Sequence, residues 1–210
     1  ASNANGITVT NAADIYVDSN ANTFGIDATN TGSGTVTVVN TGKIDPPQVG
    51  INAVGGGNVS VTNNAAVAAN QIGINAKSNN ILNDDSKTVN VIDITGPIAA
   101  GDGVFTDVDG IRAEMVGGGT VNVGTSLQRI GSNVTATSAA AGKADGVDAK
   151  GGGDVNVQMG IATTTGGANG DSWGIRAAST SNASDGNADE VNVNTQGAVN
   201  GRNGILATNN

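Results

Sequence analysis

The sequence predicts an all-β chain: a right-handed parallel β-helix of about seven turns, with three short strands per turn. Three observations predict this fold class. Two short apolar motifs alternate along the whole chain, turn-forming residues separate them, and only four residues are Phe, Trp or Tyr. Such a chain cannot fill a wide core with aromatic rings, whereas stacked short strands bury a narrow, layered core.

The first motif is Gly-(Ile/Val)-x-Ala. Its seven copies are spaced 25, 23, 37, 36, 28 and 30 residues apart, or about 30 residues per turn, as in solenoid proteins. The copies begin at Gly25, Gly50, Gly73, Gly110, Gly146, Gly174 and Gly204. Because side chains alternate along a strand, we expect the Ile or Val and the Ala to point inward. The Gly marks a corner that a side chain would obstruct.

The second motif is Val-x-Val, and it follows each of the first six copies. These strands begin at Val36, Val59, Val89, Val121, Val155 and Val191, and Ile7 begins an earlier copy. A third, weaker apolar position comes later in each turn. We place Ile15, Ile44, Val67, Ile98, Val134, Ile161 and Val199 there. Each turn therefore has three β segments with Gly, Asn, Asp, Ser or Thr at the corners.

The outward positions form columns in the same register. Between the paired valines the column reads Thr8, Thr37, Ser60, Asn90, Asn122, Asn156, Asn192, which predicts a ladder of Asn amide hydrogen bonds. On the other strand Asp148 stacks between Arg112 and Arg176, which predicts an exposed charge ladder. Trp173 is expected to point inward or to a corner.

Variation in repeat length lies in the connections, which we expect to project outward as loops. The long insertions are Lys77–Thr88, Ala99–Asp109, Thr135–Asp145, Thr163–Trp173 and Ala178–Glu190. Of these, Ala99–Asp109 and Thr135–Asp145 are the expected sites of specific contact.

The composition narrows the function classes. The chain has no Cys and no His, and its 9 Lys and Arg against 18 Asp and Glu give a net charge of −9. Disulfides, thiolate metal sites and the usual general base at neutral pH are therefore missing. The acidic balance disfavours nucleic acid, and no apolar run is long enough to insert into a membrane. We expect no cofactor.

The strongest candidate for chemistry is an acidic cluster: Asp107 and Asp109 precede Gly110, and Asp145 precedes Gly146 one turn later. In register, Asp109 and Asp145 stack about 5 Å apart, near the carboxylate separation of a retaining glycosidase. Such a pair can share a proton or hold a cation. No His or aromatic sugar platform accompanies it, so we interpret these residues as solvated or backbone-capping corners, with no catalytic role. A cation at Asp107, Asp109 and Asp145 is left open.

The alternation of Gly-Ile-x-Ala with Gly-x-Val-x-Val, the Asn, Thr, Gly and Ala richness and the lack of Cys resemble the passenger region of a monomeric bacterial autotransporter of the large surface adhesin type. The resemblance covers the whole chain, but its motifs are generic to β-helices, and filamentous haemagglutinin-like exoproteins are an alternative. It implies that residues 1–210 are a single β-solenoid fragment of a longer protein exported across the outer membrane, with a signal peptide and a C-terminal membrane β-barrel elsewhere.

From this resemblance we expect a non-catalytic stalk or adhesion module at the bacterial cell surface, acting in attachment, self-association and virulence. Its partner would be a host-cell or matrix protein or a neighbouring bacterial cell. Two alternatives stay open. One is a carbohydrate-active β-helix enzyme, a polysaccharide lyase or glycoside hydrolase, centred on Asp107, Asp109 and Asp145. The other is a pure spacer without a partner.

Overall fold

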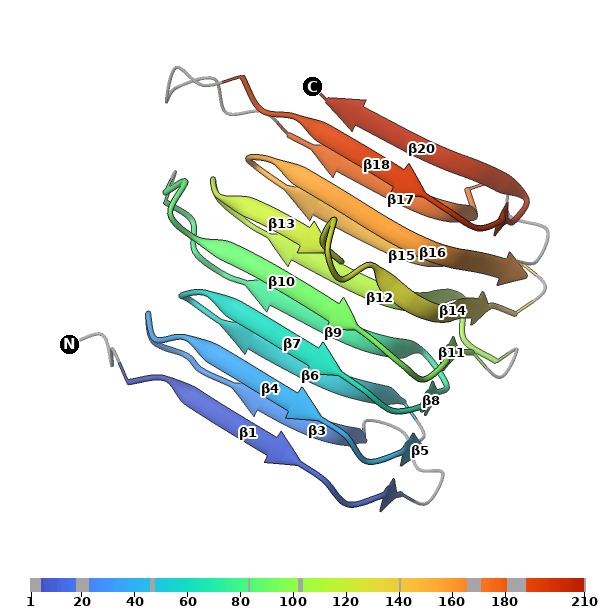
Figure 1. Cartoon of the computed structure of the whole chain (residues 1–210), viewed down its shortest axis with the longest axis horizontal. Helices are drawn as coiled ribbons and strands as arrows, with labels where there is room; N and C mark the ends of the chain where they lie inside the picture. The colour runs from blue at the N-terminus through green and yellow to red at the C-terminus, as the bar shows by residue number, and fades with distance from the viewer. Residues whose placement is uncertain are drawn as a thin grey trace.

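The computed structural model describes residues 5–17, 23–45, 48–82, 84–101, 104–139, 141–165, 171–180 and 188–209. This part of the chain is built from β-strands, and it contains no helix that is long and apolar enough to cross a membrane. In Figure 1, β1 (Ile7–Asn11) crosses the near face from left to right, the chain returns along the far face, and each turn lies above the one before. The chain is thus a right-handed parallel β-helix, as predicted.

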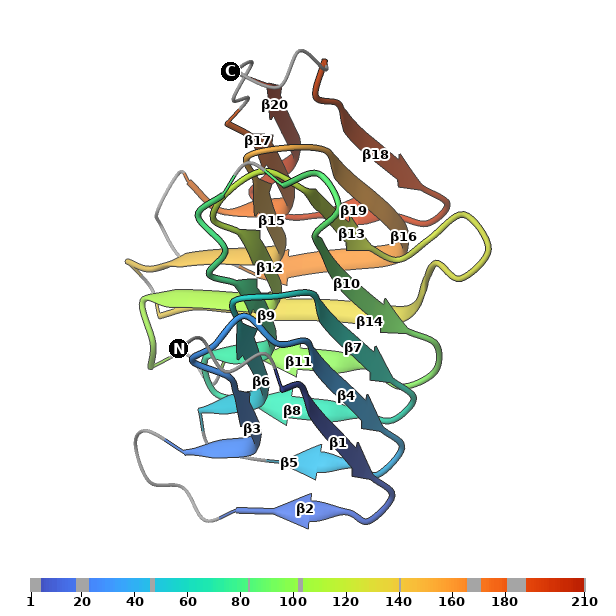
Figure 2. The ribbon, with the colours of Figure 1, turned by 90° about the vertical axis from the view of Figure 1, so that its left-hand side faces the viewer.

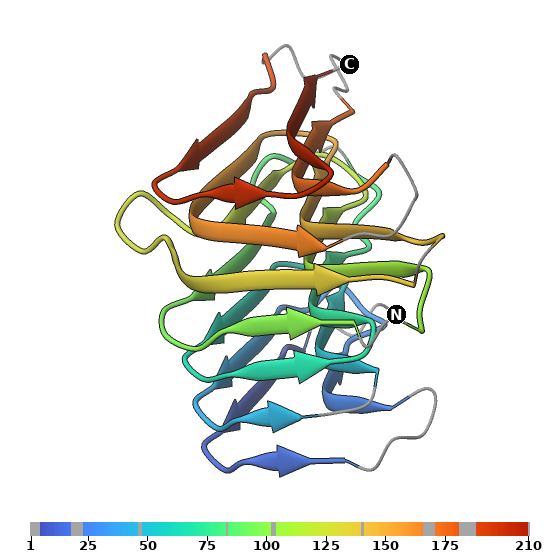
Figure 3. The same cartoon turned by 90° about the vertical axis from the view of Figure 1, so that its right-hand side faces the viewer.

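Each turn contributes one strand to each of three faces. The first face holds β1, β4 (Val36–Asn40), β7 (Val59–Asn63), β10 (Thr88–Asp93), β13 (Thr120–Val123), β16 (Val155–Thr165) and β18 (Val191–Thr195). The second face holds β2 (Ile15–Tyr16), β5 (Ile44–Asp45), β8 (Val67–Ala69), β11 (Ile98–Ala100), β14 (Ile130–Thr137), the end of β16, and β19 (Val199–Asn200). Figure 3 shows this second face toward the viewer.

The third face is a seven-stranded parallel sheet. Its strands are β3 (Phe24–Thr29), β6 (Val49–Gly55), β9 (Ile72–Ser78), β12 (Asp107–Met115), β15 (Lys143–Gly151), β17 (Trp173–Ser179) and β20 (Asn203–Asn209). The described residues therefore form seven turns of three strands, with β16 continuous across two faces of its turn.

The register confirms the predicted columns. Val36 pairs with Val59 and Val59 with Val89 on the first face, and Ile111 pairs with Ile74 and Val147 on the third. The inward side chains make one continuous core of Val, Ile and Ala that runs through the stack. Equivalent small side chains stack directly on one another, so the core needs no aromatic ring.

The third apolar column differs from the prediction at one turn. Val134 pairs with Ala162, which in turn pairs with Val199, whereas Ile161 pairs with Asn133 and is 40% exposed. The expectation that Ile161 fills the column is wrong. The chain turns a corner within β16 after the buried Met159, and a corner shifts the alternation of side chains by one residue.

One of the insertions, Thr135–Asp145, is less loop-like than expected. β14 extends to Thr137 and β15 begins at Lys143, so most of the Thr135–Asp145 segment is strand. A satellite apolar cluster lies beside the main core, because the extended strands face each other there. It comprises Ala100, Val108, Ala136 and Ala144, with Phe105 packed against them. Parts of the Lys77–Thr88, Ala99–Asp109, Thr135–Asp145, Thr163–Trp173 and Ala178–Glu190 segments lie outside the described residues.

Four of the motif glycines of the third face stand at crowded corners, as predicted, whereas Gly204 in the last turn has nothing within 4 Å of the Cβ position. A Cβ on Gly73 would lie 2.4 Å from Cγ2 of Ile98 and 2.5 Å from the carbonyl oxygen of Gly110. Gly50, Gly110 and Gly174 are blocked in the same way by a second-face Val and the next Gly. These glycines let the third face approach the second.

The outward Asn ladder is confirmed. The Nδ2 group of Asn122 donates to Oδ1 of Asn90 at 2.9 Å, Asn156 donates to Asn122 at 3.1 Å, and Asn192 donates to Asn156 at 3.2 Å. These side chains lie on the surface of the first face, half-buried or exposed. Water competes for their amides, so each bond adds little stability.

A second Asn ladder is buried at the corner between the first and second faces. Asn11 donates to Asn40 at 2.7 Å, Asn40 to Asn63 at 2.8 Å, and Asn63 to the carboxylate of Asp93 at 2.7 Å. Ser132 also donates to Asp93 and closes the ladder. This ladder is absent from the sequence predictions, although the sequence carries a signal for it: in the first four turns Asn or Asp stands four residues after the first Val or Ile of the motif, an inward position by alternation.

Candidate functional site

The densest group of charged side chains lies on the third face, over β12, β15 and β17. It comprises five carboxylates, on Asp107, Asp109, Asp145, Asp148 and Asp171, and four bases, on Arg112, Lys143, Lys150 and Arg176. We call it the charged cluster. It contains all three acidic residues that the sequence singled out.

Asp109 stands immediately before the corner Gly of β12, and its side chain is fully buried. Its Oδ2 accepts a hydrogen bond of 2.6 Å from Nε of Arg112 and also pairs with Nη2 of that guanidinium. Arg112 reaches outward to Asp107 as well, with Nη2 3.1 Å from its Oδ2. The corner folds the start of β12 back toward its middle, so residues three and five apart share one guanidinium.

Asp145 occupies the same place one turn later, in register with Asp109 as predicted. It too is fully buried. Its Oδ1 accepts the backbone N–H of Trp173 at 2.9 Å, while its Oδ2 lies 3.0 Å from Nζ of Lys143 and 3.3 Å from Nε of Arg176. Trp173 lies at the corner of its turn, half-buried, as expected. The expectation that Asp109 and Asp145 are solvated is therefore wrong, whereas the alternative of capping a backbone N–H is confirmed for Asp145.

Asp148 stacks between Arg112 and Arg176 in the predicted register. It is nevertheless only 2% exposed, and its ion pair is with Lys150, whose Nζ lies 2.6 Å from Oδ2. An exposed Arg–Asp–Arg ladder was thus wrong in two respects. The long side chains of the turns above and below cover the short carboxylate, and each Arg turns instead to an Asp at the corner of its own or the preceding turn.

The three buried carboxylates converge. One oxygen from each of Asp109, Asp145 and Asp148 lies within 4.8 Å of the other two. Asp107, by contrast, lies at the exposed rim and is outside this triad. Of the three residues that the sequence offered as cation ligands, Asp109 and Asp145 lie together in the structure. The third member of the triad is Asp148 instead of Asp107.

Burial disturbs the ionisation of two triad members, Asp109 and Asp145. Burial raises the pKa of Asp109 to about 7; Arg112 opposes the rise, and the charges of Asp148 and Asp145 add to it. Burial also raises the pKa of Asp145, although Lys143 works to lower it. For both carboxylates, the cost of desolvating the charged form therefore exceeds the stabilisation that the surrounding bases give it.

This geometry bears on the expected alternative of polysaccharide cleavage. An acid and a nucleophile must both reach the sugar. Asp109 and Asp145 are fully buried, and each is already engaged by Arg or Lys side chains. Among these residues only Asp107 offers an open carboxylate.

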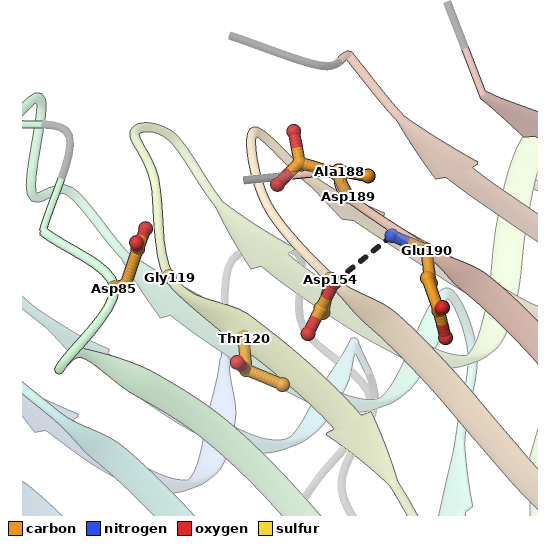
Figure 4. A pocket seen from close by; sticks show the side chains of 7 residues that line it. All are labelled: Asp85, Gly119, Thr120, Asp154, Ala188, Asp189 and Glu190. Carbon is orange, nitrogen blue, oxygen red and sulfur yellow. Dashed lines mark hydrogen bonds between the residues drawn. The ribbon is translucent and has the colours of Figure 1, made fainter. Parts of the chain in front are cut away.

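A second acidic region lies at the corner between the third and first faces. Figure 4 shows the side chains of Asp85, Asp154, Asp189 and Glu190 around a hollow of about 380 Å³. The backbone N–H of Glu190 donates to Oδ1 of Asp154 at 2.9 Å, which ties the two upper turns together. We call this region the acidic hollow. It is absent from the sequence predictions, because its acidic residues come from three separate connections.

One connection projects from the side of the rod. Residues 124–129 link β13 to β14 and stand out beyond the neighbouring turns (Figures 2 and 3). A tight turn closes their tip, since the N–H of Thr125 donates to the carbonyl of Gln128 at 2.8 Å. Leu127 at this tip is 95% exposed. This segment is not among the contact sites that the sequence predicts.

Comparisons of the chain with protein-family models, with curated proteins and with solved structures give no match, so the site is understood from its own geometry.

Proposed function

We propose that the chain is a non-catalytic β-helical module of a bacterial surface protein, a rod that attaches cells through the connections on its sides. The autotransporter passenger resemblance and export to the cell surface are part of this proposal. The partner would be a host-cell or matrix protein or a neighbouring bacterium.

One observation carries the proposal most directly. The most exposed large apolar side chain of the described residues, Leu127, stands at the tip of the projecting 124–129 turn. An exposed Leu held on a closed turn favours contact with another surface, because burying it on binding releases water. The seven-turn stack behind it is rigid, since every strand is paired in parallel with its neighbours.

The charged cluster supports a non-catalytic function as well. The carboxylates of Asp109 and Asp145 are closed off by ion pairs instead of facing a cleft for a sugar chain. The carbohydrate-active enzyme stays the second candidate, because stacked carboxylates with a raised pKa also occur in enzymes of that class.

Attachment of coated beads tests the proposal. Beads carrying the chain should bind host cells, matrix proteins or one another. Leu127→Ser should reduce that binding severalfold, whereas Ile81→Ser, which alters another apolar side chain, 77% exposed in a different connection, should not. Beads that bind nothing would contradict the proposal and favour a pure spacer.

Incubation with acidic polysaccharides tests the enzyme. The proposal expects no new reducing ends and no unsaturated sugar ends. Turnover by the parent chain, lost in an Asp109→Asn, Asp145→Asn double variant of unchanged fold, would overturn it.

A further inference from the structure

The buried triad of the charged cluster contains unsatisfied oxygens. Asp109 is 0% and Asp148 2% exposed, and the Oδ1 atom of each is buried without a hydrogen-bond partner. Their Oδ2 atoms are taken by Arg112 and Lys150. A buried charged oxygen without a partner costs several kcal/mol, on the order found for other uncompensated buried ions, so these two positions favour a positive ligand.

We propose that Asp109, Asp145 and Asp148 bind one calcium ion. The donors are carboxylate oxygens only, which suit a hard cation. Calcium binds oxygen at about 2.3–2.6 Å, so oxygens on opposite sides of one ion lie at most about 5 Å apart. The triad, with one oxygen from each Asp within 4.8 Å of the others, meets this limit.

Magnesium fits less well. Its bonds of about 2.0–2.1 Å place opposite oxygens only about 4.1 Å apart, and it gives up its water reluctantly. The triad stands on the backbone of two stacked turns, whose spacing of about 4.8 Å sets the distance between the backbones of Asp109 and Asp145. The larger ion bridges this spacing with less movement of the side chains.

The bases of the cluster compete with the ion, and two of them hold Oδ2 of Asp145. Arg176 also pairs with Asp171 at 2.8 Å and can yield this oxygen, so the main competitor is Lys143. Its Nζ lies 3.0 Å from Asp145 and 3.8 Å from Asp107 at the rim. Calcium bound to Asp145 would transfer this ammonium to Asp107, a partner already within reach. When all five carboxylates are ionised against the four bases, the cluster has one negative charge left over for the incoming cation.

The ion also has a route from solvent. A hollow of about 190 Å³ opens beside Asp148, with Asp107 and Lys143 on its wall. Water entering through this hollow would complete the coordination shell, because three carboxylates alone leave a calcium ion short of its usual six to eight oxygens.

Terbium luminescence tests the site. Tb³⁺ is a hard cation that takes oxygen ligands as calcium does, and it emits when a nearby indole is excited. Trp173 is the single Trp of the chain, and its backbone N–H bonds Asp145. Terbium added to the purified chain should show Trp-sensitised emission. Calcium should displace it, and magnesium at equal concentration should not. Absence of sensitised emission would overturn the proposal.

Two variants of opposite effect locate the ion. Asp148→Asn removes one ligand and should weaken calcium binding about ten-fold or more, whereas Lys143→Met removes the competing ammonium and should tighten it about ten-fold. The second variant keeps the test decisive if the first fails to fold. Circular dichroism shows whether both variants keep the β-structure of the parent chain.

The acidic hollow supplies the control. An Asp189→Asn, Glu190→Gln double variant removes two carboxylates there and should leave terbium and calcium binding unchanged. Emission lost in this control, or a Lys143→Met variant that binds calcium no better than the parent, would overturn the proposal.

Discussion

Replacing Asn63 with Ala tests the buried Asn ladder between the first and second faces. The Asn63 amide donates to Asp93 at 2.7 Å and to the carbonyl of Ala65 at 2.6 Å, and its oxygen accepts from Asn40 at 2.8 Å. A neutral buried hydrogen bond contributes about 1 kcal/mol and one to a carboxylate about 2 kcal/mol, so the variant should lose about 4 kcal/mol. Unfolding in urea measures this loss, and the melting temperature should fall by about 10 °C.

Asn122→Ala is the matched control, because Asn122 has the same ladder bonds on the outside of the first face. It donates to Asn90 at 2.9 Å and accepts from Asn156 at 3.1 Å. Water replaces both bonds there, so this variant should cost under about 1 kcal/mol. If Asn63→Ala costs no more than Asn122→Ala, burial does not decide the strength of the ladder and the reasoning fails.

Three further predictions follow from burial and close packing. Burial raises the pKa of Asp93, so the stability that this group contributes below pH 3.8 should fall as pH rises through the raised pKa. Asp93→Asn should remove this pH dependence and unfold at a higher temperature than the parent at pH 8; a lower melting temperature there would contradict it. Gly73→Ala, whose Cβ would stand 2.4 Å from the nearest side-chain atom, should lose about 1–3 kcal/mol in urea unfolding. At Gly204 no atom lies within 4 Å of the position that a Cβ would take. Gly204→Ala should therefore lose no free energy of unfolding through crowding. Ile111→Ala should lose about 2–5 kcal/mol, because Ile111 is fully buried in the main core, and a loss under 1 kcal/mol would refute the layered packing.

The strand columns were predictable because the period of two and the repeat length together leave one register. Val36 under Val59 and Ile74 under Ile111 follow from the motifs alone. Ile161 was not predictable in this way, since the corner within β16 changes which side chains face inward. A pattern of apolar letters does not show where such a corner falls.

In the charged cluster, too, the register was predictable and the burial was not. The stacking of Asp109 on Asp145, and of Asp148 between two Arg, came from register, but their burial did not. Whether a carboxylate is buried depends on which long side chains from the turns above and below lie over it. The pairing of Asp148 with Lys150 likewise depends on how the side chains pack and does not follow from register.

The sequence by itself determined the β-helix, its turns and the residues that stack, because backbone alternation and repeat spacing are local properties of the chain. Only the tertiary structure decided which polar columns are buried. The Asn63 ladder and the Asp109–Asp145–Asp148 triad lie inside or beneath neighbouring turns, and desolvation there depends on contacts between residues 23 to 39 positions apart.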